Sequence, residues 1–417
     1  MTDGAWIDAA LRSARPQAVA ALMRYFRDLD TAEEAYQDAC LRALKAWPRT
    51  GPRRDPAAWL IFVGRNAAID ATRKRARQQP LPDEDLISDL DDVETAVAEA
   101  IDHADYRDDV LRLLFVCCLP ELPATQQIAL ALRVVSGLSV AQIARAFLVS
   151  ESAMEQRITR AKRRVAAAEA SFEAPVAADR PDRLAAVAAM LYLVFNEGYS
   201  GAAAQASARA PLCDEAVRLA RLLLRLFPAE PEIMGLLALM LLQGSRSAAR
   251  FDADGAIVLL ERQDRTCWNR DMINEGLALL DKAMHRRVRG NYQIQAAIAA
   301  LHARAATAEE TDWSQIELLY AALEELQPSP IVTLNRAVAI SRTRGAEAAL
   351  AMIAPLSERL ASYFYFHGLR GNLLLQLGRP DEARDAFGRA IALAGTPAEA
   401  AHIREHLDRL QTTPLKN

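Results

Sequence analysis

The sequence predicts an all-α protein built from successive helical blocks. Apolar residues recur at three- and four-residue spacing along nearly all of the 417 residues, which is the period of a helix packed on one face. Alternating β-branched runs, the pattern of a strand, are missing. Prolines with acidic or small neighbours interrupt the helical pattern twice. We therefore expect domains over 1–80, 111–171 and 182–417, joined by a linker over 81–110 and a connector over 172–181.

Composition excludes several classes of protein. No apolar run reaches the ~20 residues needed to span a bilayer. The start of the chain, Met1–Trp6, lacks the basic and apolar parts of a secretory signal. We expect a cytoplasmic protein that does not contact membranes. The five cysteines have no C-x-x-C spacing and are odd in number, so neither a disulfide framework nor a zinc site is indicated.

Charge is strongly segregated along the chain, although the net charge is only −4. Residues 1–80 carry a net charge of +5 and residues 111–170 a net charge of +4, whereas residues 81–110 carry −11. The remainder is close to neutral at −2. Two basic modules joined by an acidic linker suggest that the modules meet phosphate and that the linker does not.

The first block contains an amphipathic helix that we expect from Thr31 to about Trp47. Thr31 and Glu34 have the spacing of a capping box at its start. Its apolar face is expected to hold Ala35, Tyr36, Ala39, Cys40, Ala43 and Leu44. The opposite face is expected to hold Glu33, Gln37, Asp38, Arg42 and Lys45, with Leu41 as an exposed apolar residue. Taken alone, this pattern is typical of a solvated amphipathic helix.

A second helix of this block is expected to follow a loop rich in proline and arginine. Asp55 and Pro56 supply a side-chain cap and a first-turn proline. Asn66, Asp70 and Arg73 fall on one face of this helix. The helix ends in a cluster of basic residues, Arg73, Lys74, Arg75 and Arg77. Cations are favoured at any helix C-terminus, so this cluster is weak evidence for nucleic acid.

The second block has the order of helices and turns that is typical of a helix-turn-helix. A helix to about Val135 is followed by a Ser136-Gly137 break, a short helix, a turn, and a long helix from Glu151 to about Ala168. Ser139 and Ser150 are placed as N-caps. Met154, Ile158, Ala161 and Val165 form an apolar stripe on the long helix, expected to pack on Val140, Ile143 and Phe147. Its other face is polar at the start and basic at the end, which suits base edges and phosphates respectively.

These segments resemble extracytoplasmic-function sigma factors. Residues 38–47 together with 57–70 resemble their region 2, and residues 111–168 resemble their region 4. The resemblance implies a factor that directs core RNA polymerase to promoters for transcription initiation. Because no nucleophile, phosphate-loop or metal-ligand motif is visible in the sequence, we expect no enzymatic activity, cofactor or metal. The resemblance also implies that the acidic linker threads the channel that RNA later occupies.

The resemblance assigns three sets of binding residues. Contacts with the clamp helices of the largest polymerase subunits are expected from Asp38, Leu41 and Arg42. Melting and capture of the minus-10 element are expected from Arg49, Arg53, Arg54, Trp59, Arg65, Asn66, Arg73, Lys74, Arg75 and Arg77. Recognition of the minus-35 element is expected from Ser152, Glu155, Gln156, Arg157, Thr159, Arg160, Lys162, Arg163 and Arg164.

The last 240 residues are predicted to form helical hairpins. Residues 371–390 match a tetratricopeptide unit, and the pair Glu347-Ala348 returns as Glu382-Ala383, near the ~34-residue period of such repeats. Residues 183–200 and 252–264 resemble the subgroup of these sigma factors with a fused tetratricopeptide-like domain. This domain is expected to regulate activity or to recruit a protein partner.

The same domain offers only weak candidates for chemistry. Asp252, Asp254 and Glu261 lack the glycine position and ligand set of a calcium loop. His402 and His406 lack the H-E-x-x-H pattern of a zinc site. A polar patch is interpreted either as a structural hydrogen-bond network, which we favour, or as a regulatory contact: Asn196, Glu197, Asp252, Asp254, Asp264 and Arg265.

Two other functions remain open at this stage. One is a helix-turn-helix regulator with a repeat-type sensor domain, which would not need the melting module that residues 31–77 resemble. The other is an enzyme on a tetratricopeptide scaffold, which is disfavoured because no convergent nucleophile, acid–base pair or metal set is visible.

Overall fold

The structure, a computed structural model, describes residues 5–51, 55–77, 103–119, 121–147, 149–167, 180–199, 203–253, 255–394 and six positions between 399 and 407. Within these residues the regular elements are helices, apart from one isolated antiparallel bridge between Phe251 and Ile257. The all-α prediction is therefore confirmed. The chain divides into two compact units, Met1–Val194 and Phe195–Asn417. Both predicted joining segments, 81–110 and 172–181, lie largely outside the described residues.

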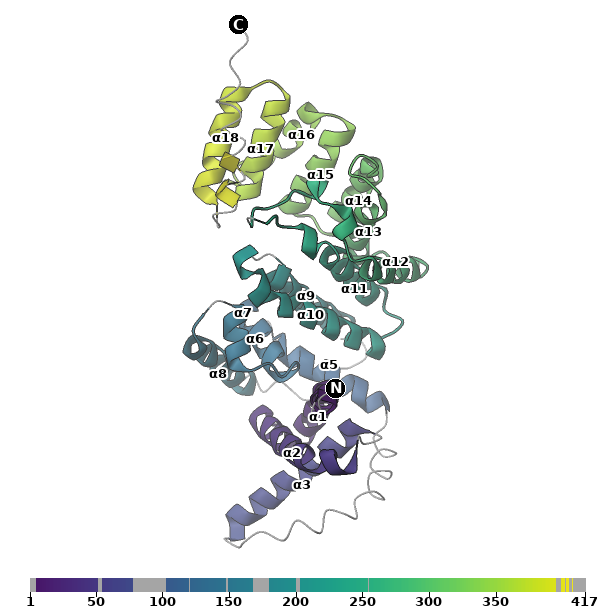
Figure 1. Ribbon diagram of the computed structural model, residues 1–417, viewed down its shortest axis with the longest axis vertical. Coiled ribbons are helices and arrows are strands. Elements are labelled where there is room, and N and C mark those ends of the chain that lie inside the picture. The colour runs from purple at the N-terminus through teal and green to yellow at the C-terminus, as the bar shows by residue number, and fades with distance from the viewer. Residues whose placement is uncertain are drawn as a thin grey trace. The chain divides into compact units, whose positions relative to one another are not determined.

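The first unit contains two groups of helices (Figure 1). The α1–α3 group consists of α1 (Ala5–Phe26), α2 (Leu29–Thr50) and α3 (Pro56–Arg77). The α5–α8 group consists of α5 (His103–Cys117), α6 (Ala124–Val134), α7 (Val140–Ala146) and α8 (Glu151–Ala167). Helix α9 (Arg180–Tyr199) runs across the boundary between the two units.

An aromatic core holds the α1–α3 group together. The indole of Trp47 is fully buried, with ring centroids 6.2 Å from Trp6 and 5.3 Å from Trp59. Helices α2 and α3 approach closely at Gly64, where a Cβ atom would lie 2.8 Å from the carbonyl oxygen of Ala35. A larger residue at Gly64 would therefore push the two helices apart.

Local capping chemistry sets the helix starts in the first unit. Ser139 and Ser150 cap α7 and α8 as predicted, and Gln142 completes a capping box with Ser139. Asp55 caps α3 as predicted. The capping box predicted at Thr31 is wrong, because the carboxylate of Asp28 accepts the Thr31 amide and hydroxyl, and α2 begins at Leu29.

The helix-turn-helix prediction is confirmed by the packing of α6, α7 and α8. The predicted stripe of α8 is buried: Met154, Ile158, Ala161 and Val165. On α7, Ile143 is also fully buried, and α8 packs against both α6 and α7. The buried stripe therefore fixes how α8 lies against α6 and α7.

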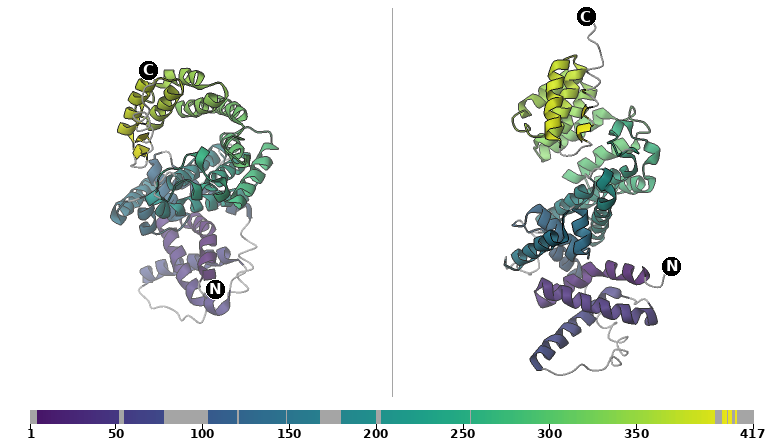
Figure 2. Two further views of the ribbon diagram at one scale, coloured as in Figure 1. Left: turned by 45° about the horizontal axis from the view of Figure 1, so that its top comes forward. Right: turned by 60° about the vertical axis from the view of Figure 1, so that its left-hand side comes forward.

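The second unit is an array of helices in which each packs on the next. The elements after α9 are α10 (Ala203–Leu226), α11 (Pro231–Gly244), α12 (Arg270–Met284), α13 (Asn291–Arg304), α14 (Trp313–Leu326), α15 (Pro330–Thr343), α16 (Ala346–Ile353), α17 (Phe364–Gln376) and α18 (Pro380–Leu393), with short 3-10 turns between them. Figure 2 shows the later helices following one another along a curve. Helices α15 and α17 start at Pro330 and Phe364, a spacing that matches the ~34-residue repeat.

The hairpin of α17 and α18 shows how closely these helices pack. Gly371 of α17 faces Phe387 of α18, and a Cβ atom at Gly371 would lie 2.5 Å from the phenylalanine ring. Gly378 has a φ of +70°, which lets the chain reverse between the helices. The residues that matched a tetratricopeptide unit in the sequence therefore form a helical hairpin.

The polar patch of this unit includes structural members. Asp264 accepts hydrogen bonds from the amide and hydroxyl of Thr266 and caps a 3-10 turn. The buried guanidinium of Arg265 donates to the carbonyl oxygens of His302 and Ala305. These contacts support the structural interpretation for Asp264 and Arg265.

Candidate nucleic-acid and protein interfaces

Helix α2 presents an exposed apolar strip flanked by charges. Leu41 is 60% exposed and Leu44 is 51% exposed, while Asp38 and Arg42 beside them are also exposed. The prediction that Leu44 lies on the buried face was wrong, because the buried residues at this end of α2 are Ala43 and Trp47. All three predicted polymerase-contact residues thus lie on one accessible face of the helix.

Helix α3 bears only part of the predicted minus-10 surface on its accessible side. Arg65 and Asn66 are exposed, and the guanidinium of Arg65 lies 4.3 Å from the ring centroid of Tyr25. Arg49, at the end of α2, is exposed as well.

Trp59 does not belong to that surface. It is buried against Trp47, so its prediction as a DNA-facing residue was wrong. Arg53 and Arg54 lie outside the described residues, as do the side chains of four basic residues at the end of α3: Arg73, Lys74, Arg75 and Arg77.

Helix α8 exposes most of the predicted minus-35 residues. Those fully on the surface are Ser152, Glu155, Gln156, Thr159, Arg160, Arg163 and Arg164. Arg157 is half-buried. Arg164 also reaches back to its own helical group, where it donates to the carbonyl oxygen of Glu121 at 3.5 Å and to Gln126 at 3.4 Å. A continuous polar and basic face therefore remains available on α8.

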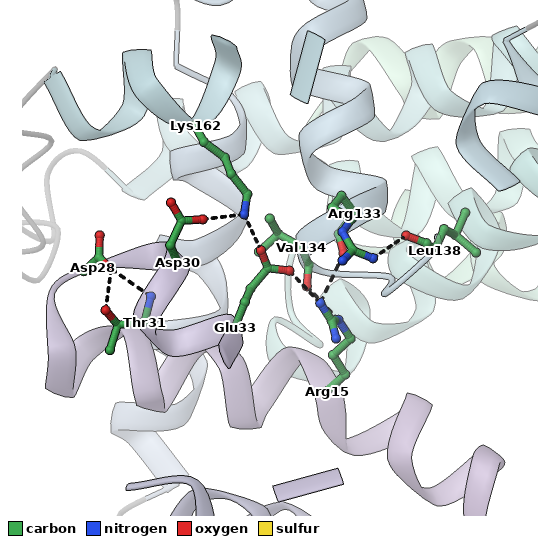
Figure 3. Close-up of polar contacts among 9 residues, drawn as sticks. All are labelled: Arg15, Asp28, Asp30, Thr31, Glu33, Arg133, Val134, Leu138 and Lys162. Atoms are coloured by element: carbon green, nitrogen blue, oxygen red, sulfur yellow. Dashed lines mark hydrogen bonds and ion pairs between the residues drawn. The ribbon is translucent and has the colours of Figure 1, made fainter. Parts of the chain in front are cut away.

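Lys162 departs from the predicted DNA-facing arrangement. Its ammonium lies 2.6 Å from Asp30 Oδ1 and 2.7 Å from Glu33 Oε2, both on α2 (Figure 3). Burial alone would lower the pKa of Lys162, but the two carboxylates outweigh it and raise the pKa above its ordinary value. In this structure Lys162 is therefore a charged contact between α8 and α2 rather than a free phosphate ligand.

Glu33 and Arg15 form a buried ion pair behind Lys162. Arg15 Nη2 lies 2.9 Å from Glu33 Oε1. The same guanidinium crosses to the α5–α8 group, where it donates to the carbonyl oxygens of Val134 at 2.9 Å and Arg133 at 3.2 Å. It also lies over the ring of Tyr36, 4.8 Å from the centroid. Each oxygen of Glu33 thus faces a different cation (Figure 3).

A second ionic contact joins the same two helical groups. The buried carboxylate of Asp109 on α5 lies 3.3 Å from Arg24 on α1 and 3.4 Å from Arg112 on its own helix. Helix α1 packs along α5 at this point.

Sequence reasoning missed the ionic contacts between the two groups. It placed Glu33 on the solvated face, yet Glu33 lies in the buried stripe of α2 between Leu29 and Tyr36. A carboxylate within an apolar stripe signals a buried cationic partner, because an unpaired buried charge is costly.

Clusters of metal-binding side chains and membrane-spanning helices are both absent from the described residues. No group of three or more histidine, cysteine, aspartate or glutamate side chains could hold a metal ion. None of the described helices is long and apolar enough to cross a membrane.

Comparisons with known proteins identify sigma-factor regions in the first unit. Residues 11–78 match the model of sigma-70 region 2, and residues 112–165 match that of sigma-70 region 4. Residues 183–284 match a family of unknown function, DUF6596. The regulator alternative is less supported, since region 2 is present beside the helix-turn-helix.

Two relatives extend the comparison. An uncharacterized protein of Rhizobium meliloti strain 1021 is 70% identical over 414 residues, which cover 99% of this chain and 98% of the relative. A probable ECF RNA polymerase sigma factor of Mycobacterium tuberculosis, SigI, is 28% identical over 161 residues, covering 38% of this chain and 54% of the relative. With both sigma-70 regions in order and a further helical unit after them, the chain is a sigma factor of RNA polymerase, distantly similar to the extracytoplasmic-function members.

Proposed function

We propose that the exposed face of α2 binds the clamp helices of core RNA polymerase, while α3 and α8 bind the minus-10 and minus-35 elements. The observation that carries the first part is the pair Leu41 and Leu44, two large apolar side chains left in water within one turn of α2. Adjacent exposed apolar residues with charged neighbours are typical of a protein interface. The role is one of binding rather than catalysis.

The DNA-binding part is supported by the way α8 is held. Its apolar stripe is locked onto α6 and α7, so the opposite face projects outward as a fixed set of donors and acceptors. Arg160 and Arg163 are exposed on this face, and arginine is well suited to bidentate contacts with guanine or phosphate.

Charge reversal on α2 tests the polymerase contact. We expect Asp38→Arg to weaken binding of core polymerase at least tenfold, about 1.4 kcal/mol, without changing the helical content. Asp8→Arg is the matched control, since Asp8 is an exposed acid of the same helical group that lies on α1 rather than on α2. Equal affinities of Asp38→Arg and Asp8→Arg in a core-binding titration would remove α2 from the interface.

Removing one arginine side chain from α8 tests the promoter contact. Arg160→Ala should cost about 1–3 kcal/mol of affinity for minus-35 duplex if the side chain contacts a base, whereas a phosphate contact would weaken all sequences and flatten the salt slope. Arg221→Ala, which removes an exposed arginine of α10, serves as the control. Binding by Arg160→Ala that equals the wild type at low and high salt would exclude both modes.

We also propose that the helical unit after region 4 regulates initiation or recruits a protein partner. Its curved array of hairpins resembles repeat domains that bind other proteins. Deleting residues 172–417 should change the rate of transcription from a cognate promoter in a purified system. An unchanged rate would assign the unit to another role.

A further inference from the structure

Two arginines of the second unit lie against aromatic rings without forming an ion pair. Arg246 and Arg250 flank the 3-10 turn η3 (Ser247–Ala249), and Trp268 ends the turn η5 (Arg265–Cys267), which packs on η3. We define the arginine site as Arg246, Arg250 and Trp268. We propose that this site binds the carboxylates of an acidic peptide segment from a partner protein. The proposal rests on the recruiting role proposed for this unit and names the chemistry of the partner.

Tyr199 holds both guanidinium groups but leaves most of their donors unused. Arg246 Nη2 donates to the Tyr199 hydroxyl at 3.2 Å, and Arg250 Nη1 donates to the Tyr199 carbonyl oxygen. The guanidinium carbon of Arg250 also lies 3.9 Å from the centroid of the Tyr199 ring. A guanidinium has five N–H donors in a planar fork, and stacking on a ring leaves the edge of that fork open. Both side chains are half-buried, and among the described residues neither forms an ion pair, so their positive charges remain available to a ligand.

Trp268 adds a buried donor at the same place. It is 3% exposed, and its ring centroid lies 6.0 Å from the guanidinium carbon of Arg246 and 4.9 Å from that of Arg265. Its indole N–H has no acceptor among the described residues, which is rare for a buried donor. Donors and positive charge therefore gather at this point without a matching acceptor.

The pKa of His302 reflects the same excess of positive charge. Burial, followed by repulsion from Arg246 and Arg265, lowers this pKa from 6.5 to about 4. Arg265 is itself engaged, because the carbonyl oxygens of His302 and Ala305 accept hydrogen bonds from it. An anion bound beside Arg246 would supply the negative charge that this cluster lacks.

Two acids act on this cluster without neutralising the arginine site. Glu309 and Glu310 oppose the burial that lowers the pKa of Arg265. Both are exposed, and neither forms an ion pair with Arg246 or Arg250. The two site arginines therefore keep room for a carboxylate from outside the chain.

The backbone that carries the site is fixed before any ligand binds. The ring of Phe195 is fully buried and stacks on that of Tyr199, with centroids 5.4 Å apart. Ser245, which precedes Arg246, is buried, and its carbonyl oxygen accepts the amide of Asn269 at 2.9 Å. Donors held in place lose little conformational freedom on binding. The arginine site is therefore organised in advance.

An exposed aromatic side chain beside Arg250 suits a peptide better than a bare ion. Tyr365 on α17 is 54% exposed, and its hydroxyl donates to Glu399 at 3.0 Å. Burial and then Glu399 raise the pKa of Tyr365 to about 12, whereas Arg250 acts in the opposite direction and so lies near it. Arginine with tyrosine or tryptophan is the combination enriched where proteins bind one another most tightly.

Charge distribution favours a short acidic peptide over nucleic acid. The chain after residue 170 has a net charge of −2, so this unit lacks the basic excess with which proteins neutralise a run of phosphates. A carboxylate is planar and matches the guanidinium fork with two parallel hydrogen bonds. Recognition of acidic motifs by clustered arginines is a common mode of peptide binding.

Titration calorimetry with the full-length protein tests the site. The probe is hexaglutamate blocked at both ends, and hexaglutamine blocked in the same way is the neutral control. Hexaglutamate should bind and hexaglutamine should not. Arg246→Gln should weaken hexaglutamate binding about tenfold, because it removes a charge-assisted bidentate contact. Arg225→Gln removes an exposed arginine of α10 outside the site and should leave the affinity within about twofold of the wild type.

Two conservative variants separate ligand binding from a loss of folding. Arg246→Lys keeps the charge but not the planar fork, and it should weaken binding about threefold. Trp268→Phe keeps an aromatic ring and removes the indole N–H, and it should weaken binding about twofold. Circular dichroism and the melting temperature show whether each variant keeps its fold. Wild-type affinity in folded Arg246→Lys and Trp268→Phe would contradict the role given to these donors.

Other outcomes would overturn the proposal as a whole. One is that the wild type does not bind hexaglutamate, and another is that Arg246→Gln and Arg225→Gln bind it equally. Tighter binding of inorganic phosphate or of a single-stranded oligonucleotide than of hexaglutamate would assign the site to phosphate instead of an acidic peptide. Because peptide binding is measured without polymerase, its failure is distinct from an unchanged transcription rate after deletion of residues 172–417, which would overturn the proposed role of the unit in initiation.

Discussion

The contact between regions 2 and 4 and the hairpin of α17 and α18 join helices by different chemistry. The first depends on Arg15, Glu33 and Lys162, which hold each other across two helical groups. The second depends on Phe387 packed directly against the backbone of Gly371. When an ion pair separates, its charged groups can bind water or phosphate instead. When an aromatic ring is removed from its packing against a glycine, it leaves a cavity behind.

The contact between regions 2 and 4 is therefore suited to separating and forming again, whereas the hairpin of α17 and α18 is suited to staying closed. Sigma regions must reach two distant promoter elements, and the contact between them is rich in groups that regain hydration. The hairpin of α17 and α18 instead buries an apolar ring against backbone, so its separation would expose apolar surface to water.

Removing the ring of Phe387 should have the largest effect. Phe387→Ala deletes a fully buried side chain and should lower the free energy of unfolding of the second unit by about 3–5 kcal/mol. Denaturant unfolding of the full chain measures this loss. Leu318→Ala is the control, since Leu318 is among the most exposed apolar residues, and its effect should be small. A loss below about 1 kcal/mol in Phe387→Ala would show that the hairpin is not closely packed.

Removing Glu33 should destabilise the first unit by about 3 kcal/mol, because Arg15 would remain buried without its carboxylate. Replacing both partners, as Arg15→Met with Glu33→Leu, should recover much of this loss. Thermal or denaturant unfolding of the two variants compares them directly. A double variant no more stable than Glu33→Ala would mean that the pair itself, rather than the stranded charge, stabilises the unit.

Acid should weaken the second unit through His302. Burial, with added repulsion from Arg246 and Arg265, lowers the pKa of His302 from 6.5 to about 4. The unfolded chain therefore binds a proton that the folded chain excludes, so the stabilisation is complete above pH 6.5 and is lost as the pH falls toward 4.

The loss at His302 should be on the order of 2–3 kcal/mol. Unfolding at pH 7 and at pH 4.5 measures it, and His302→Gln should flatten the dependence. An equal pH slope in wild type and His302→Gln would assign the effect to other groups.

Local features of this fold could be predicted from the sequence, and long-range pairings could not. Ser139 and Ser150 were identified as caps because their partners lie within three residues. Lys162 was assigned to DNA because it lies on the basic face of α8. Its partner Glu33 is 129 residues away in the sequence, so the periodicity of α8 could not reveal the contact. Trp59 was assigned to the DNA surface for a similar reason, since only packing against Trp47 shows that it faces inward.

Competition between neighbouring groups explains the capping error at Thr31. Asp28 and Thr31 both have side chains that can cap a helix, and the carboxylate of Asp28 accepts two hydrogen bonds from Thr31. The hydroxyl of Thr31 is thereby used as a donor, so the helix starts earlier than its own capping pattern indicated.

The distance between regions 2 and 4 in solution tests the central claim most directly. Electron paramagnetic resonance reports this distance between spin labels at position 8 on α1 and position 166 on α8. The labelled variant has its accessible natural cysteines replaced. The free chain should give one short distance, and addition of core polymerase with promoter DNA should lengthen it by tens of ångströms, on the order required by the promoter spacing. The same distance in the free chain and in the promoter complex would contradict the account.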